Sequence, residues 1–415
     1  MKKQSCVTSA ETISDCEDLL TEILIKLPVE SLLRCKSVSK PWLSLISNPN
    51  FVKSHINRTA GTDKTLLVHE SESASTISLV NIDSRELPVP LRFPFSTGDI
   101  ILETTFDIIG SYNGVVCVSV NYRPDHRYSF VNNKTSVYLW NPATKHSELV
   151  RECYLGLVIE PRADLGFGFD PLCNDYKVVW AERDPYEIKG GFSVLVYSLN
   201  RNAWRRVDPC PTGYFYGYSE ICVNGLLCRI GSVCKLSMAL DLNKEVFNCG
   251  VQLPVECTAI YDTRITVLND SITVITNDYE RNGRIYKWWM LDDEACLRGA
   301  GGEASWTLGL TIDVGSSFWH FCDRYNCGDI LQTRDGGFLF YDSDRKEVRN
   351  VSVSLYTHHR IIRYNESLVS ITRPKKSIGM LMKMIVRKVS PFLVSWWCFM
   401  LTLSVIVFAF AFTLN

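Results

Sequence analysis

The feature that most limits the possible folds is a short apolar run, closed by a polar turn residue, that recurs along the middle of the chain. The closing residues have an average spacing of about 52 residues and are Asp83, Asn141, Ser198, Asp241, Asp292 and Asp342. A second run, opened by a turn, precedes most of them, as in NGVVCVSV from Asn113 and DYKVVWAE from Asp175. This alternation of turns and β-rich runs indicates an all-β domain of repeated small sheets.

A single small sheet cannot bury both of its faces, so neighbouring repeats must stack and the series must close. The repeats therefore predict a six-bladed β-propeller over residues 64–372. We expect the run ESLVSI at 366–371 to pair with KTLLVHE at 64–70 and close the ring. Four tryptophans should pack between blades: Trp140, Trp204, Trp288 and Trp306. The alternative is a two-sheet sandwich, which would not require so regular a spacing.

Residues 14–58 have a different pattern, with apolar residues at helical spacing. Ser14 and Glu17 form a capping box, and an apolar stripe follows through Leu19, Leu20, Ile23, Leu24 and Leu27. Pro28 should end this helix, a second helix is expected over 31–35, and a third over 38–46, before Asn48 and Pro49. Three such helices cannot bury both sides of their apolar stripes, so part of that surface must contact a partner.

The string EDLLTEILIKLPVESLLRCKSVSKPWLSLISNPNFVKSH in this unit resembles an F-box, the helical motif by which substrate receptors bind a Skp-family adaptor in cullin ubiquitin ligases. The resemblance implies an adaptor-facing and core surface made of Leu19, Leu20, Ile23, Leu24, Leu27, Pro28, Leu32, Leu33, Val38 and Trp42. Asp15 and Cys16 depart from the family, which usually has a Leu-Pro pair there, and each lost apolar contact is worth about 1–2 kcal/mol. The alternative is that the stripe is only the core of a helical subdomain.

The segments GSYNGVVCVS, LWNPAT, GFGFDPLCNDYKVV and VLVYSLNRNAWRRV resemble, in the same order, the F-box-associated domain of the plant F-box/kelch-repeat family. The resemblance covers most of residues 100–370. It implies an α+β multidomain chain, with a three-helix F-box over 14–58 and an all-β, kelch-like propeller over 64–372.

The last part of the chain does not fit this family. Residues 392–414 are 23 residues without a charge, of which 19 are apolar. A helix of this length reaches roughly 35 Å and could cross a hydrocarbon core of ~30 Å. The preceding linker, 373–391, has six Lys and Arg and no acid, so the positive-inside rule predicts a tail anchor with residues 1–391 facing the cytosol. The alternatives are an amphipathic or buried helix, or an extension from an imperfect gene model; the protein would then lie in the cytoplasm or nucleus.

No pattern in the chain indicates catalysis, a metal site or a cofactor. The motifs GxSxG, HExxH and GxxxxGK[ST] are absent, and the 16 cysteines include no CxxC pair. The carboxylates Asp170, Asp175, Asp241 and Asp342 should bond to their own turns. Before residue 373 the chain has 38 Lys and Arg against 45 Asp and Glu, so nucleic acid is not an expected partner.

The leading hypothesis is a non-catalytic receptor that binds a Skp-family adaptor, and through it a cullin, by the F-box and an unknown target protein by the propeller. An aromatic group should contact the target: Tyr214, Phe215, Tyr216 and Tyr218. These side chains could instead pack onto blade edges. The second hypothesis is a membrane-tethered propeller scaffold in which Asp15 and Cys16 have abolished docking, and a third is a propeller hydrolase.

Overall fold

In the computed structural model, the chain divides into two compact units, Met1–Thr372 and Arg373–Asn415. All of the described residues belong to the first unit. They are 18–59, 65–70, 76–81, 88–93, 103–123, 133–155, 164–183, 192–207, 220–230, 235–248, 251–254, 263–268, 271–280, 283–299, 303–315, 318–325, 328–333, 337–342, 347–354 and 359–372.

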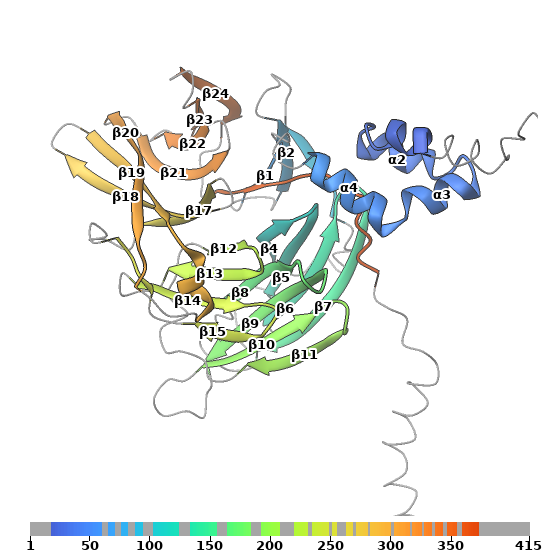
Figure 1. Ribbon diagram of the computed structural model, residues 1–415, viewed down its shortest axis with the longest axis horizontal. Coiled ribbons are helices and arrows are strands. Elements are labelled where there is room, and N and C mark those ends of the chain that lie inside the picture. Colours follow the sequence, from blue (N-terminus) through green and yellow to red (C-terminus); the bar gives the residue numbers. More distant parts are fainter. Residues whose placement is uncertain are drawn as a thin grey trace, which may run out of the picture. The chain divides into compact units, whose positions relative to one another are not determined.

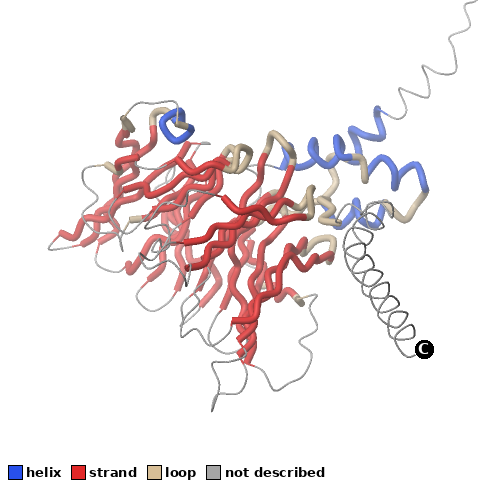
Figure 2. The backbone as a smooth tube through the Cα atoms, turned by 90° about the horizontal axis from the view of Figure 1, so that it is seen from below, coloured by secondary structure: helices blue, strands red, loops and turns tan. Residues whose placement is uncertain are grey.

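Within residues 18–59 the chain forms four helices, which lie together at one side of the strands (Figure 2). They are residues 18–24, α2 (Val29–Cys35), α3 (Lys40–Ile46) and α4 (Pro49–Thr59). The sequence predicts three helices, the third ending before Asn48 and Pro49; α3 does end at Ile46, but the prediction lacks α4. Pro49 instead takes the first position of α4, where its fixed φ suits a helix start and its missing N–H is not needed.

The described strands form six antiparallel sheets (Figure 1). The first sheet has the order β25-β1-β2-β3, with β1 (Thr65–Glu70), β2 (Thr76–Asn81), β3 (Val89–Leu91) and β25 (His359–Arg363). The second contains β4 (Glu103–Tyr112), β5 (Val115–Arg123), β6 (Asn133–Asn141) and β7 (His146–Leu155). The third contains β8 (Asp164–Asp170), β9 (Asp175–Arg183), β10 (Phe192–Ser198) and β11 (Ala203–Val207).

The other three sheets follow in chain order. The fourth contains β12 (Glu220–Val223), β13 (Leu226–Ile230), β14 (Lys235–Asp241), β15 (Val246–Asn248) and β16 (Val251–Gln252). The fifth contains β17 (Arg264–Leu268), β18 (Ser271–Glu280), β19 (Gly283–Leu291) and β20 (Trp306–Gly315), with the short helix η4 (Glu294–Arg298) between the last two. The sixth contains β21 (Phe318–Tyr325), β22 (Gly328–Thr333), β23 (Gly337–Asp342) and β24 (Glu347–Ser354).

One edge strand of each sheet contacts the corresponding strand of the next sheet. These contacts connect β25 with β4, β4 with β8, β8 with β12, β12 with β17, β17 with β21, and β21 with β25. The six sheets are therefore linked in a closed series, as expected for repeated units that bury their faces against each other.

The first sheet closes this series because strands from the two ends of the domain pair in it. β25 runs antiparallel to β1, from Leu66 opposite Arg363 to Glu70 opposite His359. The prediction that 366–371 supplies the closing strand is wrong, because the strand ends at Arg363 and residues 364–372 form no strand. The side chains of Leu368 and Ile371 in this segment are nevertheless buried.

The apolar core is distributed between neighbouring sheets. In β5, Val115 and Cys117 belong to a cluster with β8 and β9, whereas Val116 and Val118 belong to a cluster with β1 and β2. Successive side chains point to opposite faces of a strand, so both faces of β5 are buried. Of the four predicted tryptophans, Trp140, Trp204 and Trp306 pack in clusters shared by two sheets, the first buried and the other two half-buried. Trp288 is also buried, but the described members of its cluster all belong to the fifth sheet.

All four carboxylates at strand ends are expected to accept hydrogen bonds from their own turn backbone. This prediction is confirmed for two of them. Oδ1 of Asp170 and of Asp241 each accepts a hydrogen bond at 3.0 Å from the backbone N–H two residues later. Asp175 differs, because its Oδ2 accepts a hydrogen bond from Ser198 Oγ at 2.5 Å. The side chain of Asp342 lies outside the described ones.

The third and fourth sheets approach each other closely at β8 and β12. A Cβ atom on Gly168 would lie 2.6 Å from Cys222 Sγ, so any larger residue there would force the neighbouring side chains to move. Burial of the Cys222 thiol between the strands raises its pKa to about 12. Burial likewise raises the pKa of Cys228 on β13.

We expect iodoacetamide at about pH 8 to alkylate Cys173, which is exposed, and to leave Cys222 and Cys228 unmodified in the folded protein. Only the thiolate reacts, and a raised pKa keeps both buried groups protonated at that pH. Mass spectrometry of labelled peptides, with a urea-unfolded control, measures the rates. Labelling of Cys222 as fast as Cys173 would contradict the close packing of the two sheets.

Candidate functional site

The ends of the N-terminal helices are set by short-range hydrogen bonds. Ser39 precedes α3, and its Oγ accepts a hydrogen bond from the Trp42 backbone N–H at 3.3 Å. Asn48 precedes α4, and its Oδ1 accepts one from the Asn50 backbone N–H at 2.8 Å. The helix starts, and with them the directions of the side chains, are therefore fixed locally.

The helices share a small apolar core. Its buried members from this unit are Leu24, Val29, Leu32, Ile46 and Phe51. Two polar contacts connect α4 to the chain before α2: His55 Nε2 lies 3.0 Å from the Leu27 carbonyl O, and Arg58 Nη1 donates to the Ile25 carbonyl O at 3.2 Å. A carbonyl only accepts, so the buried His55 ring donates through Nε2.

Four large apolar side chains of the unit remain exposed. The exposed fractions are 59% for Leu19, 60% for Ile23, 65% for Val38 and 47% for Leu43. Leu19 and Ile23 are four residues apart, so they lie on one face of the first helix. We call these four residues the exposed apolar set. Large apolar side chains left in solvent by a unit that already has a core indicate contact with a partner.

The structure divides the ten predicted docking residues into three groups. Four are exposed: Leu19, Ile23, Pro28 and Val38. Four are half-buried: Leu20, Leu27, Leu33 and Trp42. Leu24 and Leu32 are buried in the core, at 1% and 0% exposed. The ten residues predicted from the sequence do not include Leu43. Leu43 could have been found because it is an apolar residue of α3, next to Trp42, that the core does not need.

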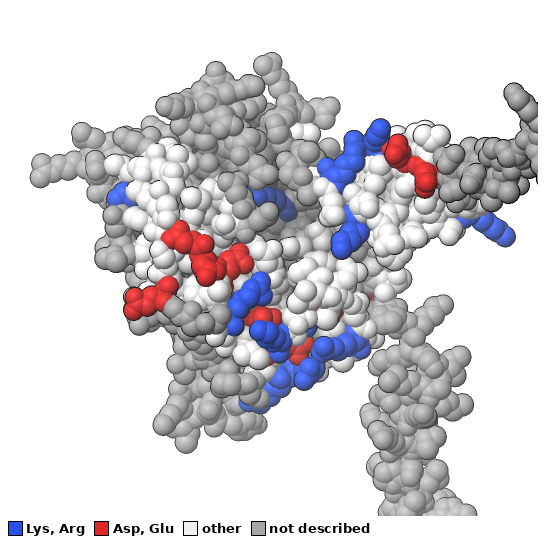
Figure 3. Space-filling view, in the orientation of Figure 1, with Lys and Arg blue, Asp and Glu red and all other residues white. Residues whose placement is uncertain are grey.

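The charged side chains of the helical unit are mainly basic. Residues 18–59 contain six Lys and Arg and three Asp and Glu, and the helical part shows several basic groups with an acidic patch beside them (Figure 3). Burial lowers the pKa of Lys36. Glu30 and Arg34 pair at 2.5 Å, but both are about three-quarters exposed, so the pair adds little stability. A partner with an apolar centre and acidic groups around it would complement this unit.

Several predicted features lie outside the described residues. They include the aromatic group Tyr214, Phe215, Tyr216 and Tyr218, the departure at Asp15 and Cys16, and the apolar segment 392–414. Among the residues that the structure describes, no helix is both long and apolar enough to span a membrane. The described part of the chain also contains no group of three His, Cys, Asp or Glu that could hold a metal ion.

Two domain families match the sequence. The profile for the F-box domain matches residues 16–54, and the profile for the F-box associated beta propeller domain matches residues 66–296. The first corresponds to the helical unit, and the second to the second, third and fourth sheets and to all of the first and fifth sheets except β25 and β20.

Similar proteins come from Arabidopsis thaliana. The F-box protein CPR1 is 26% identical over 50% of this chain and 52% of its own length. A second F-box protein is 28% identical over 57% of this chain and 56% of its own, and an F-box/kelch-repeat protein is 27% identical over 51% and 57%. The chain thus spans about half the length of these curated relatives. Among solved structures, apo AztD from Citrobacter koseri aligns with a TM-score of 0.33 and 12% identity over 73% of this chain and 99% of its own, a likeness too weak to support an inference.

Proposed function

Because the chain belongs to the family of F-box proteins that carry an F-box-associated β-propeller domain, we propose that it is the substrate-recognition subunit of an SCF-type cullin ubiquitin ligase. The F-box docks a Skp-family adaptor, and the β domain binds a target protein. The chain itself catalyses no step; it raises the effective concentration of the target near the subunits that transfer ubiquitin.

The exposed apolar set is the observation that carries the docking proposal. Each of its four side chains keeps roughly half or more of its surface in water. Burial of the remainder against an adaptor would contribute about 1 kcal/mol or more per side chain. The half-buried residues Leu20 and Trp42 would extend the contact, while Leu24 and Leu32 stabilise the unit from inside.

For the β domain, we propose a six-bladed propeller. The closed series of contacts among the six sheets supports this architecture, as does the pairing of β25 with β1. The predicted target-binding aromatics, from Tyr214 to Tyr218, lie in the segment between β11 and β12, where the chain passes from one sheet to the next. We assign target binding to this end of the strands.

A buried arginine holds the strand ends next to that segment. Arg229 on β13 is 4% exposed, and its Nη2 donates to Glu220 Oε2, at the start of β12, at 2.7 Å. Its Nη1 bonds to Asp164 at the start of β8, and its Nη2 also donates to the Leu165 carbonyl O at 3.2 Å. Two neighbouring sheets are thereby fixed at one point, which suits loops that bind a protein from a rigid base.

The proposed docking is tested by titrating the full chain, kept in a mild detergent because of residues 392–414, with a purified Skp-family adaptor. We expect saturable binding with a Kd of about 1 μM or below. Absence of binding at adaptor concentrations of about 50 μM would contradict the proposed function and leave the scaffold hypothesis.

A further inference from the structure

The segment after β25 has the burial of a core element but not the pairing of a strand. Tyr364, Ser367, Leu368 and Ile371 are between 0% and 3% exposed, although no strand is formed there. The Tyr364 backbone N–H still donates to the Thr65 carbonyl O at 3.1 Å, and the pairing with β1 stops at that point. The segment must therefore satisfy its backbone groups in another way.

Asn141, at the end of β6, provides hydrogen bonds to this segment in place of a neighbouring strand. It is fully buried, and its Nδ2 donates to the Ser367 carbonyl O at 3.1 Å and to the Val369 carbonyl O at 2.9 Å. Its Oδ1 accepts from the backbone N–H groups of Ala143 and Thr144, at 3.1 and 3.3 Å. All the hydrogen-bonding capacity of this side chain is used, half on its own turn and half on the segment.

Ser367 makes a second connection to the same sheet. Its Oγ donates to the carbonyl O of Asn113, in the turn between β4 and β5, at 2.6 Å. The next residue, Gly114, has a φ of +75°, and a Cβ there would lie 2.4 Å from Ser367 Oγ and 2.6 Å from the Asn365 carbonyl O. The turn therefore requires glycine both for its conformation and for the close approach of the segment.

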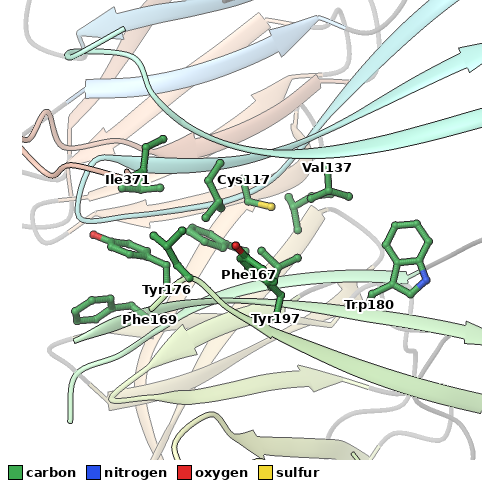
Figure 4. Close-up of a cluster of buried hydrophobic side chains, with 13 residues drawn as sticks. Cys117, Val137, Phe167, Phe169, Tyr176, Trp180, Tyr197 and Ile371 are labelled. Carbon is green, nitrogen blue, oxygen red and sulfur yellow. The ribbon is translucent and has the colours of Figure 1, made fainter. Parts of the chain in front are cut away.

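The apolar side chains of the segment enter two different cores. Ile371 packs in the cluster between the second and third sheets, near Cys117 and Tyr176 (Figure 4). Leu368, three residues earlier and 3% exposed, belongs instead to the core of the helical unit, with Leu24 and Phe51 among its members. The turn residue Ala143 packs against the same helical core.

We propose that residues 364–371 form a strap between the F-box and the β domain. The strap completes the F-box core through Leu368, and its hydrogen bonds through Asn141 and Ser367 fasten the F-box to the second sheet. The F-box of this protein is then not an independent module, because one of its core residues comes from beyond the last strand. The strap itself does not depend on the proposed function. If the adaptor docks as proposed above, the strap also fixes the target-binding domain relative to the adaptor.

Hydrogen exchange of the full chain without adaptor, followed by mass spectrometry, tests the strap. In Leu368→Ala we expect amides of α2 and α4 to exchange roughly tenfold faster or more, while amides of β9 and β10 keep their parental rates. The matched control is Leu240→Ala, because Leu240 is 0% exposed in the cluster between the third and fourth sheets. It should accelerate exchange in β9, β10 and β14 and leave the F-box amides unchanged.

Leu368→Val, a smaller truncation, keeps the test decisive where the alanine variant fails to fold. It should accelerate hydrogen exchange of the amides in the same F-box helices, but by a smaller factor. The strap would be overturned if the F-box amides exchanged at the parental rate in both Leu368 variants. It would also be overturned if Leu240→Ala accelerated exchange of the F-box amides as much as Leu368→Ala does. Because no adaptor is present, a positive result together with failed adaptor binding would retain the strap and reject only the proposed function.

Discussion

Leu19→Asp combined with Ile23→Asp is expected to weaken binding of the Skp-family adaptor roughly 100-fold or more, with the melting temperature of the chain nearly unchanged. Both side chains are about 60% exposed in the free protein, so aspartate is solvated there and the fold is not affected. In the complex the two carboxylates would be buried without partners, which costs several kcal/mol. Isothermal titration measures the affinity, and circular dichroism the melting curve.

The matched control for this variant is Leu172→Asp, in the turn after β8, because Leu172 is 80% exposed and equally apolar. Its affinity for the adaptor should equal that of the parent chain. Aspartate at Leu24 would be a poor probe, because Leu24 is 1% exposed and its replacement would unfold the F-box whether or not the adaptor touches it. Parental affinity in the Leu19 and Ile23 double variant would show that docking uses another surface.

Glu245→Ala is expected to lower the free energy of unfolding by about 3–5 kcal/mol. The side chain of Glu245, in the turn after β14, is 8% exposed. Its carboxylate lies 2.8 Å from Lys177 Nζ, 3.2 Å from Arg201 Nη1 and 3.1 Å from Arg205 Nη1. Lys177 on β9 is 2% exposed, and its other bond in the described chain is to the Leu242 carbonyl O at 2.5 Å. Removal of the carboxylate therefore leaves a buried ammonium without its counter-charge, between the third and fourth sheets. Urea unfolding followed by tryptophan fluorescence measures the loss.

The reverse change, Lys177→Met, should cost much less, about 1–2 kcal/mol, because Glu245 loses the ammonium but keeps both arginines, and the Leu242 carbonyl loses one hydrogen bond. In the double variant the unpaired ammonium is absent, so stability should recover by about 2 kcal/mol or more relative to Glu245→Ala. Equal losses from the two single changes would contradict this assignment of the buried charge.

The sequence predicts the repeated sheets well because their signal is periodic and local. Turn residues such as Asp170 and Asp241 bond to their own backbone wherever the strands pair, so the fold around them does not alter their role. The sequence does not predict α4 for a local reason: a proline is compatible both with the end of a preceding helix and with the start of a new one, and α3 ends before Pro49 while α4 begins at it.

Features that depend on tertiary contacts could not be predicted in this way. The run at 366–371 has the apolar residues of a strand, but its carbonyls bond to Asn141, a residue more than 200 positions earlier. Helical spacing likewise placed Leu19 and Leu24 in one docking stripe, although one is exposed and the other is covered by the F-box core. The side of a helix that packs internally is decided by the other helices and, here, by Leu368.

Site-specific photo-crosslinking is the most direct measurement of the proposed docking. Benzoylphenylalanine would replace Leu19 or Val38 in the exposed apolar set, or Leu172 as the control, in the full chain mixed with adaptor and irradiated. We expect an adaptor crosslink from the variants at Leu19 and Val38 and none from the variant at Leu172. A bound adaptor that crosslinks from Leu172, or from neither F-box position, would contradict docking through the exposed apolar set.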